Sequence, residues 1–250
     1  MPSDSSLSFF PDNKTSSYTT KLPKEIILYD DYEVGLSTFH FPLTYFNVKK
    51  DEFKVFKIIE PANAFVEDSF VEIGRIREGR YPPDSMVEEM FKGVPKSLIN
   101  ASVSNINRRV TLEIGEHDIA LNLNLLEFLG ENFTPTPREG YIFEKSTVYH
   151  GLNVIHYQRA CHNLYIYCDL VEPRTVGDSQ VSLLSVVPNP TGGSFGDTVV
   201  QRFDNMKYFP VGKRRFDTIK IDVVSDYGEK IPFEDGKVFI ELHLRKVKRR

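Results

Sequence analysis

The sequence predicts an all-β protein in which antiparallel strands surround one core as a sandwich or barrel. The alternation of apolar and polar residues is strictest in three C-terminal segments: Leu164 to Pro188, Lys207 to Phe233 and Glu234 to Lys246. Within the second segment, Ile219 and Ile221 alternate with Lys220 and Asp222, which places the apolar side chains on one face. Half-buried strands of this kind are typical of antiparallel sheets that cover a core.

The N-terminal third is expected to add strands after a polar arm. Residues 1–17 are rich in serine, with Phe9-Phe10-Pro11 as their apolar anchor, and we expect a flexible arm that orders on contact with a neighbour. Pro23 and the Asp30-Asp31 turn separate the segments that follow. Strands are expected over 18–22, 25–28, 32–41, 53–59 and 70–76.

A helix is expected over 86–91, where Met86, Val87, Met90 and Phe91 recur at helical spacing. Prolines and a capping Asp84 or Ser85 precede it, and Gly93 follows.

Further strands are expected over 110–114 and 119–125, and a short second helix over 125–129 before Gly130. We count about ten to twelve short strands and one or two helices. Strands and helices do not alternate regularly along the sequence, and no segment has the composition of a linker between domains. We therefore expect a single domain over residues 18–245, followed by a basic tail over 246–250. A helix-bearing insertion between strands is common in jelly rolls.

Composition narrows the functional classes. The net charge of −4 and the pI near 5.9 give no overall field that would attract nucleic acid or an acidic membrane. No apolar run is long enough for a membrane helix, and the N-terminus lacks a signal-peptide pattern, so we expect a cytosolic or nuclear protein without a membrane partner. Cys161 and Cys168 are expected to be small buried thiols.

We expect no catalytic, cofactor-binding or metal-binding residues, and no enzyme activity. His150, His156 and His162 recur every six residues, but six extended residues separate side chains by roughly 20 Å, so surface or interface histidines are favoured over a metal site. The segment from Gly192 to Asp197 lacks the lysine and flanking elements of a phosphate-binding loop. No nucleophile elbow and no cysteine with a neighbouring base is present.

Two basic clusters remain, Lys213-Arg214-Arg215 and the C-terminal stretch from Arg245 to Arg250. One interpretation is a solvated turn and a solvated tail. The other is that the tail makes weak contact with nucleic acid or directs nuclear import.

Parts of the sequence resemble the minor capsid (penton) protein of Polinton, or Maverick, elements, the large virus-like DNA transposons of eukaryotes. The resemblance is carried by the following stretches: Tyr32 to Leu36, Phe41-Pro42, Tyr45 to Val48, Gly79 to Tyr81, Tyr167 to Val171, Val176 to Asp178, Leu183 to Pro188, Tyr208 to Pro210, Phe216 to Ile219, Asp226 to Phe233 and Gly236 to Arg245.

The resemblance implies a single jelly-roll sandwich without enzyme activity or cofactor. It implies a homopentamer at each fivefold vertex of an icosahedral capsid, beside a double-jelly-roll major capsid protein. The protein would belong to the virion, assembled in the nucleus or cytoplasm of the host cell. Outward aromatic residues on strands, namely Tyr165, Tyr167 and Phe239, suit such interfaces. The alternative is a jelly-roll module that binds carbohydrate or a receptor.

Overall fold

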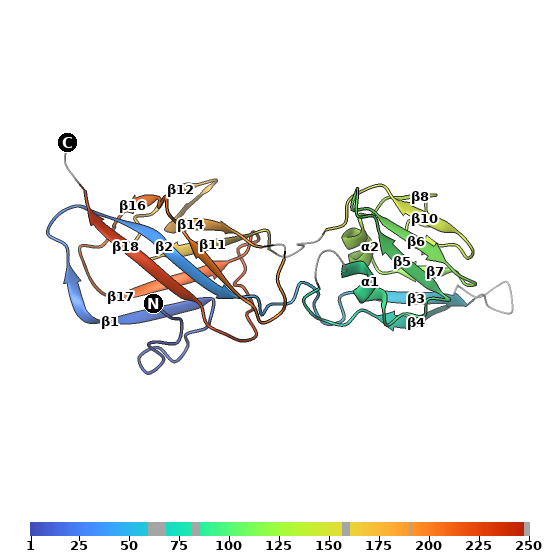
Figure 1. The fold of residues 1–250 in the computed structure, drawn as a ribbon, viewed down its shortest axis with the longest axis horizontal. Coiled ribbons are helices and arrows are strands. Elements are labelled where there is room, and N and C mark those ends of the chain that lie inside the picture. The colour runs from blue at the N-terminus through green and yellow to red at the C-terminus, as the bar shows by residue number, and fades with distance from the viewer. Residues whose placement is uncertain (60–68, 82–85, 157–160, 191, 248–250) are drawn as a thin grey trace. The chain divides into compact units, whose positions relative to one another are not determined.

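The computed structural model describes residues 1–59, 69–81, 86–156, 161–190 and 192–247. It divides the chain into two compact units (Figure 1). Unit 1 comprises Met1–Tyr45 and Ala160–Arg250, and unit 2 is the intervening segment Phe46–Arg159. Each unit has its own hydrophobic core.

The elements of unit 1 are β1 (Ser17–Ile27), β2 (Tyr32–Pro42), β11 (Asn163–Cys168), β12 (Arg174–Val176), β13 (Ser179–Val181), β14 (Leu183–Pro188), β15 (Thr198–Arg202), β16 (Tyr208–Pro210), β17 (Arg215–Val224) and β18 (Phe239–Lys246). Those of unit 2 are β3 (Lys54–Ile59), β4 (Ser69–Arg75), α1 (Met86–Phe91), β5 (Ile99–Val103), β6 (Val110–Ile114), β7 (Ile119–Leu121), α2 (Leu123–Leu129), β8 (Phe133–Thr134), β9 (Ile142–Phe143) and β10 (Val148–Gly151).

Unit 1 is a sandwich of two antiparallel sheets. The first has the strand order β1-β17-β11-β14, and in the second β2 pairs with β15 and β16 on one side and with β18 on the other. The chain crosses between the sheets from β1 to β2, from β2 to β11, from β14 to β15, and from β16 through β17 to β18. These crossings produce the Greek-key arrangement of a jelly roll.

The predicted apolar faces meet between these two sheets. Leu164, Ile166 and Cys168 of β11 are buried, as are Ile221 and Val223 of β17. Alternate residues of β2 and β18 face them across the same core. The fold prediction of an all-β jelly-roll sandwich, with short helices in an insertion between strands, is confirmed.

The expected flexible arm is instead packed on its own chain. Pro2 forms a β-bridge with Phe239, and the Ser3 amide donates to the Val238 carbonyl at 2.9 Å. Ser3 and Ser6 are buried. The polar sequence gave no sign of this, because backbone groups make the contact and do not depend on apolar side chains.

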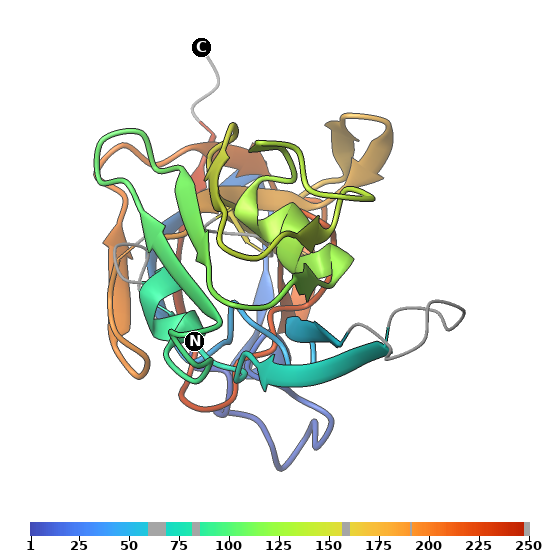
Figure 2. The ribbon, with the colours of Figure 1, turned by 90° about the vertical axis from the view of Figure 1, so that its right-hand side faces the viewer.

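Unit 2 contains two further four-stranded sheets, with orders β5-β6-β10-β8 and β4-β3-β7-β9, and both helices (Figure 2). Asn122 caps the N-terminus of helix α2, and its side chain accepts from the Leu125 amide. Gly130 caps the C-terminus in the left-handed conformation with φ 100°. The predicted helices are both present, although Asp84 and Ser85 lie outside the described residues.

Two sequence predictions need correction. The expected single domain over residues 18–245 is interrupted, because the segment between β2 and β11 buries enough apolar residues to form a second core. The strand count of ten to twelve is too low: the described residues form 18 strands, and several of these span only two or three residues. So short a strand leaves no alternation to recognise.

Candidate interaction surfaces

The outer face of the β2–β18 sheet carries a row of three apolar or aromatic side chains. The strand register places Val200 and Phe239 on either side of His40. The rings of His40 and Phe239 meet edge to face at 5.2 Å. Val200 is 47% exposed and Phe239 36% exposed, so this row faces solvent in a single copy of the chain. Within the described residues, both helices belong to unit 2 and none lies in unit 1.

A second row on this face is built over a glycine. Gly35 pairs with Tyr208 on one side and with His243 on the other. The tyrosine ring lies over Gly35, where an added Cβ would be 3.1 Å from the ring. The Tyr208 hydroxyl lies 2.9 Å from Nδ1 of His243, and the Arg245 guanidinium lies 3.5 Å from the ring centroid. Glu33 fixes Arg245 through hydrogen bonds of 2.9 and 3.0 Å.

The other sheet presents a comparable face. The register places Tyr165 between Val186 and Val224, with Tyr167 two residues further along β11. Both tyrosines are half-buried, and burial raises the pKa of the Tyr167 hydroxyl. Tyr165, Tyr167 and Phe239 therefore lie on outward faces, as the alternation predicts.

A buried polar network fixes the points where the chain leaves and re-enters unit 1. The Tyr45 hydroxyl donates to Oδ1 of Asn189 at 2.6 Å, and Nδ2 of Asn189 donates to the Cys161 carbonyl at 2.7 Å. Tyr45 ends the first part of the unit, and Cys161 lies at the start of the second. Nothing in the sequence indicates this network, because its members are 28 to 144 residues apart.

The two cysteines are free and buried, and burial raises the pKa of the Cys168 thiol to about 12. A thiol with so high a pKa is not an activated nucleophile.

The basic residues near one end of unit 1 are largely matched by acids. The ion pairs are Lys213–Asp169 at 2.5 Å, Arg214–Asp31 at 3.9 Å, Arg215–Glu25 at 3.0 Å, Arg245–Glu33 at 2.9 Å and Lys246–Asp30 at 2.5 Å. This neutralisation favours the interpretation of residues 213–215 as a solvated turn. The tail residues 248–250 lie outside the described part of the chain.

The three evenly spaced histidines are divided between the two units. His150 lies on β10 of unit 2, where Nδ1 is 3.2 Å from the Thr111 hydroxyl. His156 also belongs to unit 2, whereas His162 belongs to unit 1. Within the described ranges, no three His, Cys, Asp or Glu side chains are grouped closely enough to hold a metal ion. The same ranges contain no helix that is long and apolar enough to cross a membrane.

The segment Gly192 to Asp197 connects β14 to β15, as expected of an inter-strand loop. The Asp197 side chain accepts from the Ser194 amide at 2.7 Å, and the Asp197 carbonyl accepts from the Leu43 amide at 2.7 Å. The loop therefore uses its carboxylate to stabilise its own turn.

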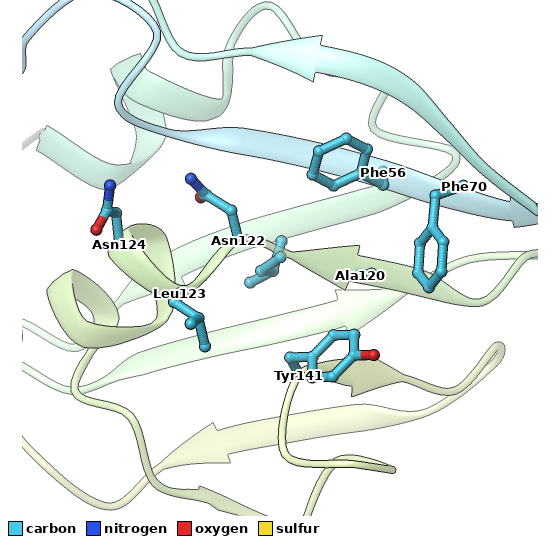
Figure 3. Close-up of a pocket in the computed structure, with 8 residues that line it drawn as sticks. Phe56, Phe70, Ala120, Asn122, Leu123, Asn124 and Tyr141 are labelled. Atoms are coloured by element: carbon cyan, nitrogen blue, oxygen red, sulfur yellow. The ribbon is translucent and has the colours of Figure 1, made fainter.

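Unit 2 contains a pocket that sequence analysis did not anticipate (Figure 3). Its volume is about 580 Å³, and the rings of Phe56, Phe70 and Tyr141 surround it with Leu123. The Phe56 and Phe70 rings are perpendicular at 6.5 Å, and Leu123 is 71% exposed. These residues come from β3, β4, α2 and the loop before β9, so no local motif marks the pocket.

Both side-chain amides in this pocket form hydrogen bonds within the protein, and Asn124 donates to the Glu52 carbonyl at 3.5 Å. Asn122 donates to the Glu52 carbonyl at 2.8 Å and accepts from the Lys54 and Leu125 amides. The pocket is lined by three aromatic rings, the aliphatic residues Ala120, Leu121 and Leu123, and the two asparagines, without a charged group.

No family model matches this sequence, and no curated protein matches it. Among solved structures, the crystal structure of the selenomethionine-labelled mavirus penton protein is similar. The similarity covers 94% of this chain and 92% of the mavirus chain, with a TM-score of 0.52 and 12% sequence identity. The chain has the fold of a penton protein. At this identity the likeness is one of architecture, and it agrees with the penton resemblance that the sequence itself carries.

Proposed function

We propose that this protein is a structural, non-catalytic capsid component, namely the penton subunit of a virus-like DNA element of the Polinton or Maverick type or of a related virus. Five copies would form each fivefold vertex of an icosahedral capsid. The observation that carries the proposal is the architecture shared with the mavirus penton protein over nearly the whole of both chains.

The surfaces of unit 1 support a role in self-association. A closed ring joins two different surfaces of one subunit, head to tail. The sandwich offers two outer sheet faces, each with a half-exposed aromatic row, around Phe239 on one and around Tyr165 on the other. Aromatic side chains on a polar surface are enriched at such interfaces.

Two further parts of the proposal concern partners and location. We propose that the ring contacts a double-jelly-roll major capsid protein and that the protein is a virion component, assembled in the nucleus or cytoplasm. Contact between the basic tail and nucleic acid is the weaker element, since Arg245 and Lys246 are paired with Glu33 and Asp30.

The mass of the purified protein in solution tests the proposal. Light scattering coupled to size exclusion should give five times the chain mass of 28.8 kDa, and electron microscopy should show fivefold rings. A stable trimer, or a monomer that forms no ring at any protein or salt concentration, would contradict it.

A binding module for carbohydrate or a receptor is the second candidate, and the pocket of unit 2 favours it. Aromatic rings such as those of Phe56, Phe70 and Tyr141 are common in ligand pockets. Screening the protein against immobilised glycans tests this function. Retention that Phe70→Ala abolishes, with Tyr227→Ala on an exposed turn of unit 1 as the control, would support it. The absence of any retained glycan would count against carbohydrate binding.

A further inference from the structure

A small hairpin projects from unit 1 without a partner strand. Strands β12 and β13 pair only with each other, and neither belongs to the four-stranded sheets (Figure 1). Gly177 and Asp178 form the two-residue turn, with Gly177 at φ 63°, as the first position of a type II′ turn requires. A two-stranded hairpin alone is at most marginally stable in water, so a fixed one needs support.

Contacts with neighbouring strands hold the base of the hairpin in place. The Arg174 guanidinium lies 3.8 Å from the centroid of the Phe209 ring and donates to the Leu183 carbonyl at 3.2 Å. The Glu172 amide donates to the Pro210 carbonyl at 2.9 Å. Beyond this clamp, Thr175 and residues 177–180 are half-exposed or exposed. The hairpin is therefore held at its base and presents its tip and outer backbone to solvent.

On the second sheet, strand β18 has an edge that is only partly covered. The Ser3 amide donates to Val238, and the Ile240 amide donates to the Met1 carbonyl at 3.1 Å. This short N-terminal pairing ends there. From Leu242 to Lys246, the strand pairing of β18 is with β2 alone. Since alternate residues of a strand direct their backbone groups to opposite sides, Leu242 and Leu244 direct theirs to the open edge.

The hairpin and the open edge lie on opposite sides of the sandwich. The clamp attaches the hairpin to β14 and β16, which are outer strands at one side of the two sheets. Strands β1 and β18 are the outer strands at the other side. Met1 joins these two, because it pairs with Ile240 of β18 and its carbonyl accepts from the Tyr18 hydroxyl of β1 at 3.3 Å.

We propose that the β12–β13 hairpin of one copy adds to the open edge of β18 in the next copy. This inference rests on the proposed function, because it identifies the contact that closes the ring. A projecting strand pair on one side and an unpaired edge on the other form a head-to-tail contact, which repeats around a ring. Strand addition would supply main-chain hydrogen bonds to edge groups that otherwise stay unpaired and can promote aggregation.

Side chains and charges fit this occupant. Val176 and Val181 share one face of the hairpin, and Leu242 and Leu244 are half-buried on the inner face of β18, so strand addition would extend the apolar cover. Among the described residues, Asp178 at the hairpin tip is without an ion pair. Lys24, in the exposed irregular stretch of β1 on the same side of the sandwich as β18, is likewise without one, and its charge is opposite.

A proline at the open edge tests the inference. Leu244→Pro removes the edge donor while the amides directed at β2 remain, and Leu244→Ala is the matched control, since it removes the same side chain but keeps the donor. We expect Leu244→Pro to abolish ring formation in light scattering and electron microscopy, while Leu244→Ala forms rings. Rings from both variants would overturn the inference and leave the proposed function intact. Absence of rings from the unaltered protein would overturn the proposed function itself.

A charge exchange gives a second test that does not depend on folding of the proline variant. Asp178→Lys and Lys24→Glu should each weaken association about fivefold, as for an exposed ion pair, and the double variant should recover it. Two single variants that associate like the unaltered protein, or a double variant without recovery, would overturn the inference.

Discussion

Replacing Gly35 with alanine should destabilise the β2–β16–β18 sheet, because the glycine leaves room for the Tyr208 ring. The new Cβ would lie 3.0 Å from the Lys207 carbonyl oxygen and 3.1 Å from Cδ1 of Tyr208. Both contacts are tighter than ordinary packing, and one involves backbone that cannot rotate away. Overpacking of this kind costs about 1–3 kcal/mol.

Displacement of the ring adds a second cost. Tyr208 would lose its stacking on Arg245 and its hydrogen bond to His243, which in exposed positions contribute about 1 kcal/mol each. We therefore expect a loss of up to about 3–5 kcal/mol in the free energy of opening of this sheet. Because the chain has two compact units, one global unfolding transition would not report the stability of this sheet alone.

Native-state hydrogen exchange, read on peptides from β2, β16 and β18, measures the local opening directly. Gly192→Ala is the matched control, because a Cβ there meets no atom within 4 Å and it lies in the same unit. In a Tyr208→Ala background, Gly35→Ala should cost less, since the ring it displaces is gone. An effect of Gly35→Ala below about 0.5 kcal/mol, or one unchanged by removing the ring, would refute the reasoning.

Three other outcomes follow from the structure. Tyr45→Phe removes a buried hydrogen bond to Asn189 and should lower the free energy of opening of unit 1 by about 1–3 kcal/mol, measured by native-state hydrogen exchange on peptides of unit 1; no change would contradict the role of the network. The pKa of Asp226 is lowered from its usual 3.8, because hydrogen bonds from the Asn163 side chain and from the amides of Asn163 and His162 outweigh the effect of burial. Its contribution to stability is therefore full well above the ordinary pKa and is lost as the pH falls and the carboxylate is protonated in the folded protein, so Asp226→Asn should lower the melting temperature at pH 7 and the difference from the unaltered protein should shrink steadily as the pH is lowered below about 4. Deletion of residues 246–250 should leave the melting temperature of unit 1 nearly unchanged; unchanged nuclear accumulation and nucleic-acid retention would show that the tail only solubilises.

Long alternating strands could be predicted from the sequence because their side chains report their burial directly. The apolar residues of β11 and β17 are buried as the two-residue period predicts, and Asn122 and Gly130 bracket α2 as capping chemistry requires. The division into two units could not be predicted in this way. Both cores are made of the same residue types, and the chain passes from one to the other at Tyr45 without a change in composition.

The candidate surfaces could not be found from sequence motifs either, because they depend on backbone groups and on contacts between residues that are distant in the sequence. The open edge of β18 is a property of backbone groups, and those groups are open only because the N-terminal pairing ends at Ile240. At the base of the hairpin, Arg174 contacts the ring of Phe209, which lies 35 positions away in the sequence. Neither residue alone indicates this contact. Pairing of main-chain groups does not depend on which side chains the strands carry, so two chains can keep the same edges while nearly all their residues differ. The Leu244→Pro and Leu244→Ala pair separates the backbone contribution to the proposed contact from the side-chain contribution.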